Sequence, residues 1–289
     1  MNAITIQAFA KLNLTLGVLY KRMDGYHALD SLMQGIDLSD TVTVEKARDV
    51  LVTASGMTLP YENTLRRAAK RYEAHTGRGA HIRVIKRVPA EAGMGGGSAD
   101  AAAVLFAMQR LYGEVDDRTL YEIALSVGAD VPFCLYTQQG GALARAQGVG
   151  ESLIKAAGMP MHFVVAKPKQ GVSTPALFSA LKLPRENPDN AAALAAIAKN
   201  ELAALGKLLY NALEEPAVAL VPEIGRIKQS LLEAGALGAC MTGSGSAVFG
   251  LFADQDAAQQ ALPAVSYADF SCVCKALLPA GAAAGTGRM

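Results

Sequence analysis

The sequence of 289 residues has no marked excess of charge of either sign. Its 27 lysine and arginine residues are balanced by 26 aspartate and glutamate residues, which leaves a formal net charge of +1. Proteins that bind nucleic acid usually concentrate positive charge, so nucleic acid is not expected as a partner. The sequence also lacks a charge-free apolar run of membrane-spanning length, and its first residues do not resemble a secretory signal. We therefore expect a cytoplasmic protein without membrane contact.

Cysteine is scarce, and no two cysteines have the Cys-x-x-Cys spacing of a metal or redox site. The four cysteines are Cys134, Cys240, Cys272 and Cys274. The last two are separated by one residue in an alternating, strand-like run. This distribution favours reduced, packed thiols over disulfides or a zinc site.

Two common nucleotide-binding patterns are missing too. The pattern G-x-x-x-x-G-K-[ST] fails because Ser98 follows Gly97 with no lysine between them. The pattern G-x-G-x-x-G fails because Ser98 stands where a third glycine belongs. These absences weaken the interpretation of the chain as a standard phosphate-binding or dinucleotide-binding protein.

Glycines are nevertheless concentrated in the run PAEAGMGGGSADAAAVL at residues 89–105, directly before a helical pattern. Glycines without a Cβ let backbone N–H groups converge on an anion, and the N-terminus of the following helix carries a positive dipole. We expect Ser98 to cap that helix and Gly113 to end it. The run predicts a phosphate-binding loop, and a flexible glycine linker is the alternative.

Strand-like and helical patterns are mixed without a regular β-α-β rhythm. Period-two runs predict strands at residues 4–9, 14–19, 41–46, 81–86, around Cys134, at 161–166 and up to 252. Helical spacing predicts helices at residues 63–75, 98–112, 120–127, 191–213 and 224–234. We therefore expect an α+β fold rather than a doubly wound parallel sheet.

The length predicts two domains, since one domain takes about 150 residues. A glycine-rich stretch at 140–150 places the expected boundary near residue 157. The expected parts are an N-terminal domain at 1–157, a second domain at 158–280 and a mobile tail at 281–289.

Three separated segments resemble the motifs of the GHMP small-molecule kinase superfamily. They are AKLNLTLGVLYKRMDGYH at residues 10–27, the glycine-rich run, and TGSGSAVFGLF at residues 242–252. The elements DGYH (24–27), GADVPF (128–133) and GVSTPALF (171–178) are similar to those of the members that act on a cytidylated methylerythritol. Together the matching segments cover most of the chain, from about residue 8 to 252.

The resemblance implies two α+β domains with the active site in the cleft between them. The first domain would bind ATP over the glycine-rich loop, and the second would lie on the substrate side. The implied reaction is ATP-dependent phosphorylation of the 2-hydroxyl of 4-diphosphocytidyl-2-C-methyl-D-erythritol in the non-mevalonate isoprenoid pathway. The alternatives are a homoserine or mevalonate type of kinase, a catalytically silent ligand-binding relative, and a Rossmann oxidoreductase, which the failed fingerprint disfavours. A monomer or weak homodimer is expected.

The resemblance also implies two catalytic residues. Asp130 would accept the proton of the substrate hydroxyl, and Lys11 would lie near it and keep it ionised. Phosphoryl transfer needs alignment and charge neutralisation more than covalent chemistry, so these residues suffice together with the loop. We expect the chain after Asp130 to be extended, because Pro132 follows Val131. The alternatives are an aspartate at a helix turn and a lysine at a strand end.

Substrate contacts follow from the same resemblance. Tyr26 would stack on the cytosine, His27 would contact its edge, and Phe178 would supply the opposite plate. Phe178 is otherwise an ordinary core residue of a helix capped by Thr174. The remaining implied contacts, with Met33 in place of an aromatic residue near the base, are Asn13, Met33, Thr174, Gly243, Ser244 and Gly245. A tight hairpin is the alternative for these two glycines.

Nucleotide contacts are implied for Asn63 and for the loop. The loop residues are Pro89, Gly93, Met94, Gly95, Gly96, Gly97 and Ser98. ATP and Mg²⁺ are therefore the expected cofactors, with Ser98 as a candidate magnesium ligand or simply a helix cap. No acidic magnesium ligand is assigned by the sequence.

Overall fold

The computed structural model describes residues 1–183 and 185–279, so the expected tail at 281–289 lies outside the described residues. The chain forms two compact units of interleaved segments. Unit 1 comprises Met1–Lys11, Leu38–Pro89 and Gly95–Gly141. Unit 2 comprises Leu12–Asp37, Ala90–Met94 and the described residues from Ala142 onward. The expected boundary near residue 157 falls inside the last segment, and a division at that residue stays a prediction.

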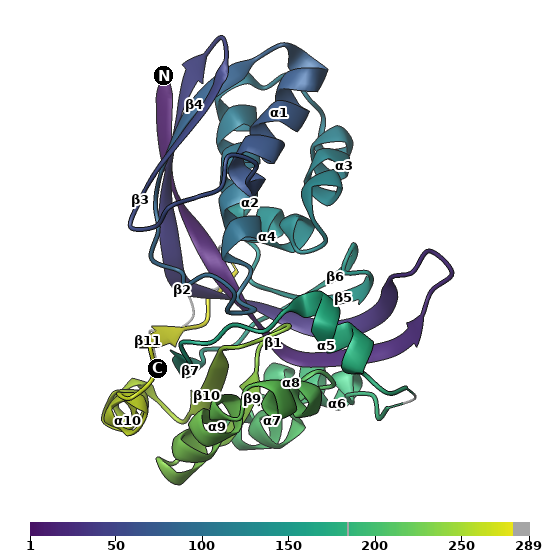
Figure 1. The fold of residues 1–289 in the computed structure, drawn as a ribbon, viewed down its shortest axis with the longest axis vertical. Coiled ribbons are helices and arrows are strands. Elements are labelled where there is room, and N and C mark those ends of the chain that lie inside the picture. The colour runs from purple at the N-terminus through teal and green to yellow at the C-terminus, as the bar shows by residue number, and fades with distance from the viewer. Residues whose placement is uncertain (184, 280–289) are drawn as a thin grey trace, which may run out of the picture. The chain divides into compact units, whose positions relative to one another are not determined.

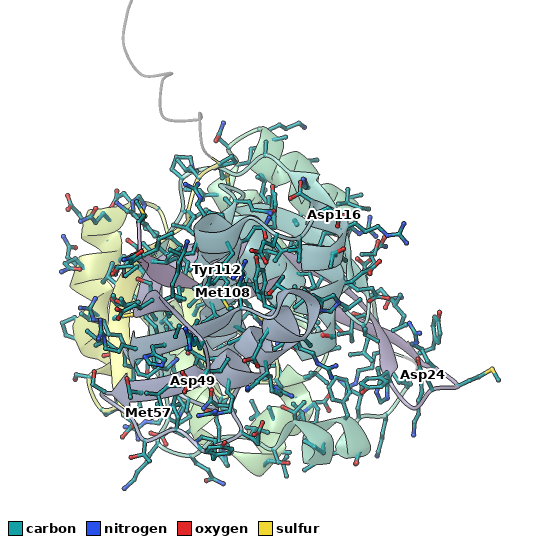
Figure 2. All side chains as sticks on the ribbon, turned by 90° about the horizontal axis from the view of Figure 1, so that it is seen from above. Asp24, Asp49, Met57, Met108, Tyr112 and Asp116 are labelled. Atoms are coloured by element: carbon teal, nitrogen blue, oxygen red, sulfur yellow. The ribbon has the colours of Figure 1, made fainter. Side chains whose placement is uncertain are left out.

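Two long strands contribute to both units. They are β1 (Ala3–Lys21) and β2 (His27–Ala47). Their hydrogen bonds include Arg22 N to Tyr26 O near the turn and Lys46 N to Asn2 O at the other end. Figure 2 labels Asp24 in the turn that joins the two strands.

Unit 1 is a sheet covered by helices on one face (Figure 1). The strand order is β3-β4-β2-β1, with β3 parallel to β4 and β4 antiparallel to β2. The strands and helices that lie wholly in this unit are β3 (Val50–Ser55), β4 (Gly79–Ile85), α1 (Thr64–Thr76), α2 (Gly96–Tyr112), α3 (Asp117–Val127) and α4 (Val131–Gln138).

The helices of unit 1 begin and end where local chemistry dictates. Asn63 caps α1 by accepting a hydrogen bond from Arg66 N, and Gly77 ends it at φ +70°. Asp116 caps α3 in the same way. Helix α2 is rich in alanine and is buried along most of its length, so close packing rather than an amphipathic pattern holds it.

Unit 2 contains further strands on β2 and β1 and a separate antiparallel sheet. Strand β5 (Leu143–Gly148) pairs with β2 and β6 (Ser152–Ala156), while β8 (Tyr210–Asn211) pairs with β1. The separate sheet has the order β11-β7-β10-β9. Its strands are β7 (His162–Lys167), β9 (Gly238–Met241), β10 (Val248–Phe252) and β11 (Phe270–Lys275).

Helices pack on this second sheet, and α9 contacts β7, β9 and β10 (Figure 1). Their apolar side chains form the core of the unit, which includes Ile224, Ile227 and Leu231. The helices of unit 2 are α5 (Thr174–Ala180), α6 (Asn190–Ala198), α7 (Leu202–Leu208), α8 (Glu214–Leu220), α9 (Glu223–Glu233) and α10 (Gln255–Ala261), followed by a 3₁₀ turn, η1 (Leu262–Val265).

The α+β class is confirmed, and several expected elements are corrected. The strand expected around Cys134 is helix α4, because a short apolar run has no period that separates strand from helix. The helix expected at 191–213 is two helices separated near Asn200, whose φ is +57°, followed by strand β8. Within the described residues, no helix is both long and apolar enough to cross a membrane.

Candidate active site

Lys11 and Asp130 form an ion pair in unit 1. The Lys11 Nζ lies 3.4 Å from the Asp130 Oδ2. The lysine side chain is 4 % exposed, whereas the aspartate side chain is 36 % exposed. The two residues expected to act together are thus adjacent, and the carboxylate remains accessible to a ligand.

Asp130 is placed by a helix start rather than by an extended segment. It occupies the N-cap position of α4 in a right-handed helical conformation, and its side chain makes no capping hydrogen bond. The expected extension after Asp130 is therefore wrong, because Pro132 fits the first turn of a helix, where its missing N–H is not needed. A carboxylate that is not used as a cap is available for other chemistry.

The second half of the glycine-rich loop lies beside Lys11. Gly95 has φ +69°, and a Cβ built on it would lie 3.1 Å from the Lys11 Cε. Gly95 is also the N-cap of α2, which no side chain caps. The expected cap by Ser98 is therefore wrong, because the helix begins at Gly96 and Ser98 lies in its first turn. An uncapped helix start presents backbone N–H groups and a positive dipole to an anion.

A cavity of about 430 Å³ opens beside Asn63 in unit 1. Its walls combine apolar side chains with polar groups, both of which small-molecule sites use. The lining residues are Val52, Ala54, Met57, Thr58, Leu59, Pro60, Tyr61, Asn63 and Arg66. The next residue, Thr64, faces the start of α2, since a Cβ on Gly97 would lie 3.1 Å from the Thr64 Oγ1. The cavity and the uncapped helix start are therefore neighbours.

The first half of the loop packs in unit 2 against the third glycine motif. A Cβ on Gly93 would lie 2.0 Å from the Thr242 carbonyl oxygen, so only glycine fits there. Ser246 N donates to the Glu91 carbonyl at 3.1 Å, and Ala247 N donates to the Ala92 carbonyl at 3.3 Å. The third motif thus approaches the loop backbone to backbone, as expected for a turn that contains Gly243 and Gly245.

Asn13 joins this region through its backbone. Its N–H donates to the Thr242 Oγ1 at 3.0 Å, and that hydroxyl donates to the Gly93 carbonyl at 3.3 Å. Its side-chain amide donates to the Ser31 Oγ at 2.8 Å. Asn13 of the first motif is therefore bonded directly to the third motif and, through the Thr242 hydroxyl, linked to the glycine-rich loop.

Two other expected substrate residues are also paired in unit 2. The Thr174 Oγ1 donates to the Ser244 Oγ at 2.9 Å. Helix α5 begins at Thr174, and Ser173 rather than Thr174 is its cap, one residue earlier than expected. The N-terminus of this helix and the third motif therefore meet at the hydroxyl groups of exposed Thr174 and half-buried Ser244.

His27 and Phe178 stack with ring centroids 4.7 Å apart and an interplanar angle of 21°. Burial lowers the pKa of His27 below its ordinary value, and the Lys21 charge adds to this effect. Tyr26 is 66 % exposed. The stacking partner of Phe178 is thus His27, while Tyr26 was the expected opposite plate. Met33 is 2 % exposed, so it offers no surface to a base in this structure.

A cluster that was not anticipated from the sequence lies in unit 1. The Lys86 Nζ donates to the Asp100 Oδ2 at 2.6 Å and to the Asp40 Oδ2. Burial raises the pKa of the Asp100 carboxyl to about 7, with Lys86 opposing this rise and the Asp40 charge adding to it. In the sequence, the only sign of this cluster is that each of the three charged residues lies in a mostly apolar segment. No local spacing links the three positions.

Ser98, the candidate magnesium ligand, lies in the first turn of α2. Among residues 1–183 and 185–279, no three or more His, Cys, Asp or Glu side chains are grouped so as to hold a metal ion. Magnesium at nucleotide sites usually keeps water and phosphate oxygens and takes only one or two protein ligands. A lone hydroxyl in the first turn of α2 is compatible with that mode.

Comparisons with known proteins identify the family of the chain. The family model of the GHMP kinases N terminal domain matches residues 63–138, and that of the GHMP kinases C terminal matches residues 193–270. A 4-diphosphocytidyl-2-C-methyl-D-erythritol kinase of Carboxydothermus hydrogenoformans is 42 % identical over 255 residues, which are 85 % of this chain and 87 % of the relative. The chain belongs to the 4-diphosphocytidyl-2-C-methyl-D-erythritol kinase family. As a GHMP kinase it is an ATP-dependent small-molecule kinase.

Solved structures place the fold in the same group. A crystal structure of a 4-(cytidine 5'-diphospho)-2C-methyl-D-erythritol kinase is 37 % identical, with a TM-score of 0.81 over 94 % of this chain and 99 % of that one. A homoserine kinase from Cytophaga hutchinsonii, 22 % identical, has a TM-score of 0.75 over 96 % of each chain. The homoserine kinase shares the fold, whereas the 4-diphosphocytidyl-2-C-methyl-D-erythritol kinases share the sequence as well. The expected family is confirmed.

Proposed function

We propose that this chain transfers a phosphoryl group from ATP to the 2-hydroxyl of 4-diphosphocytidyl-2-C-methyl-D-erythritol in the non-mevalonate isoprenoid pathway. The observation that carries the proposal is the Lys11–Asp130 pair beside Gly95 at the uncapped start of α2. It joins a proton acceptor, a cation and an anion-binding helix end. The names and identities of the relatives support the substrate.

The proposed reaction assigns one step to Asp130. Its carboxylate accepts the proton of the substrate hydroxyl as the hydroxyl oxygen forms a bond to phosphorus. The bond between that phosphorus and the bridging oxygen breaks, and ADP leaves with the electron pair. The Lys11 ammonium at 3.4 Å stabilises the carboxylate charge and attracts the phosphoryl oxygens.

The nucleotide is proposed to lie in unit 1. Its base would enter the cavity beside Asn63, and its phosphates would meet the N–H groups of Gly96, Gly97 and Ser98. Mg²⁺ belongs to the proposal: Ser98 would hold it together with phosphate oxygens and water, and it would neutralise phosphate charge when bound.

The substrate is proposed to contact unit 2. We assign substrate contacts to Asn13, Thr174 and Ser244 and to the turn that contains Gly243 and Gly245, and the exposed Thr174 and half-buried Ser244 supply hydroxyl groups. The His27–Phe178 stack offers an aromatic surface to the cytosine, and exposed Tyr26 stands next to it in sequence. Because the two rings are only 4.7 Å apart, a base inserted between them would have to displace one of them.

We further propose that the protein acts in the cytoplasm as a monomer or weak homodimer. The free thiols of its four cysteines support a reducing compartment.

The experiment that tests the function is ADP release from ATP and Mg²⁺ against a panel of alcohols. The panel contains 4-diphosphocytidyl-2-C-methyl-D-erythritol, cytidine diphosphate esters of other alcohols, homoserine and mevalonate. Selective turnover of the cytidylated methylerythritol is expected. Turnover of homoserine or mevalonate instead would contradict the proposal, and turnover of none would favour a silent binding relative.

A further inference from the structure

The two ends of the glycine-rich loop touch each other in unit 1. The loop leaves this unit after Pro89 and returns at Gly95. A Cβ on Gly96 would lie 3.0 Å from the Val88 Cγ1, so the strand end and the helix start are in direct contact. The shape of the segment between them therefore depends on how firmly these two ends are joined.

One lysine bridges the two ends. Lys86 follows β4 directly, and its Nζ donates to the Asp100 Oδ2 in α2 at 2.6 Å. The same ammonium donates to the Asp40 Oδ2 in β2. The Asp40 Oδ1 in turn accepts the N–H groups of Arg87 at 2.5 Å and Val88 at 2.8 Å. Asp40 thus holds the backbone that enters the loop, and Asp100 holds the helix that leaves it.

Stability alone does not account for this cluster. The side chains of Lys86, Asp40 and Asp100 are 6 %, 0 % and 1 % exposed. Burying charges costs several kcal/mol per ion, and apolar residues of similar size often replace a buried ion pair without loss of stability. In addition, among the described residues the Asp100 Oδ1 is buried without a hydrogen-bond partner, which costs free energy and calls for an explanation.

We propose that the Asp40–Lys86–Asp100 cluster is a positioning device for the phosphate-binding loop. It fixes the entry of the loop relative to the start of α2, so that the N–H groups at the helix start stay aimed at the bound phosphates. The cluster touches neither nucleotide nor alcohol and acts through the loop backbone. This inference rests on the proposed binding of ATP phosphates at that loop.

The test compares two substitutions of Asp100. Asp100→Ala removes the oxygen that accepts from Lys86, whereas Asp100→Asn keeps one. Asp100→Ala is expected to raise the KM for ATP by about tenfold, because displacement of a positioning group by a fraction of an ångström weakens aligned contacts. The kcat and the KM for the alcohol should change by less than about threefold. Asp100→Asn should restore most of the loss.

A matched control separates positioning from stability. Tyr72 is buried in α1, and its hydroxyl donates to the Gln109 Oε1 in α2 at 3.0 Å. Tyr72→Phe removes a partly buried hydrogen bond of α2 at Gln109, far along the helix from the loop. It should lower the melting temperature while leaving the KM for ATP unchanged. Equal effects of Tyr72→Phe and Asp100→Ala on that KM, at a temperature where both are folded, would overturn the inference.

A second variant covers the case in which Asp100→Ala does not fold. Asp40→Asn keeps an oxygen for the N–H groups of Arg87 and Val88 but turns an amide donor toward the Lys86 ammonium. It should raise the KM for ATP as well, and an unchanged KM would overturn the inference. The wild-type protein distinguishes failure of this inference from failure of the proposed function. Absence of turnover in the wild type refutes the function. Normal turnover in the wild type, with an unchanged KM for ATP in the variants, refutes only the positioning role.

Discussion

Two lysines of unit 1, Lys11 and Lys86, lie beside consecutive glycines of the loop, but their carboxylate partners differ in exposure to solvent. We call the Lys11–Asp130 pair open and the Asp40–Lys86–Asp100 cluster closed. A Cβ on Gly95 would touch the Lys11 side chain, and a Cβ on Gly96 would lie 3.8 Å from the Lys86 Nζ. The partner of Lys11, Asp130, is 36 % exposed, whereas the partners of Lys86 are at most 1 % exposed. The same residue types thus form one pair whose carboxylate a ligand can reach, to which we assign chemistry, and one cluster that solvent does not reach, to which we assign positioning.

The largest effect is expected from breaking the closed Asp40–Lys86–Asp100 cluster. Lys86→Met leaves two buried carboxylates without their cation, which should lower the free energy of unfolding by about 3–5 kcal/mol. Urea denaturation measures it. Lys70→Met is the control, because Lys70 pairs with Glu73 at the surface and is 52 % exposed, so a loss of at most about 1 kcal/mol is expected. Similar losses of unfolding free energy in both variants would show that a buried ion pair contributes no more to stability here than a surface pair.

The next prediction tests whether an exposed side chain of unit 2 binds the substrate without contributing to stability. Tyr26 is 66 % exposed, while Phe178 packs partly against the core. Tyr26→Ala should weaken binding of the diphosphocytidyl substrate by about 1–3 kcal/mol, with ATP binding and stability unchanged. Calorimetric titration with each ligand separately measures both. Phe178→Ala should instead lower stability as well as substrate binding. Equal losses of ATP and substrate affinity in Tyr26→Ala would leave that residue without a recognition role.

A smaller effect is expected from disturbing the contact between Gly95 of the loop and Lys11 of the open pair. Gly95→Ala adds a Cβ 3.1 Å from the Lys11 Cε at a positive φ, so it should displace Lys11 and lower kcat by about tenfold. Gly77→Ala is the matched control, since Gly77 has φ +70° and nothing within 4 Å of its Cβ position. Both variants should lose about 1 kcal/mol of stability from the backbone alone. Equal kcat values in the two variants would contradict the contact.

The comparison also shows what local sequence can predict. The helix expected at residues 63–75 is α1, because apolar spacing acts within a few residues, although Asn63 was expected as a nucleotide contact and not as the cap of this helix. The start of α2 was misplaced, since a serine is the commoner cap but Gly95 at positive φ occupies the position. Asp130 appeared beyond the end of a helix, yet it begins the next one.

The closed cluster was beyond the reach of local rules. Asp40 lies in β2, Lys86 directly after β4 and Asp100 in α2, and only the packing of these segments brings them together. The same holds for the His27–Phe178 stack, which joins residues about 150 positions apart. The motif resemblance supplied the family and Lys11 with Asp130, but not the packing around them.

The most direct test of the account is a single-turnover measurement with Asp130→Asn. Wild-type and variant proteins are saturated with ATP, Mg²⁺ and 4-diphosphocytidyl-2-C-methyl-D-erythritol, and ADP formation is followed by rapid quench. The asparagine keeps the shape of the side chain but cannot accept the hydroxyl proton, so transfer should slow by about 10²-fold or more, with nucleotide affinity little changed. Transfer at nearly the wild-type rate would contradict the assignment of the open carboxylate to the chemical step.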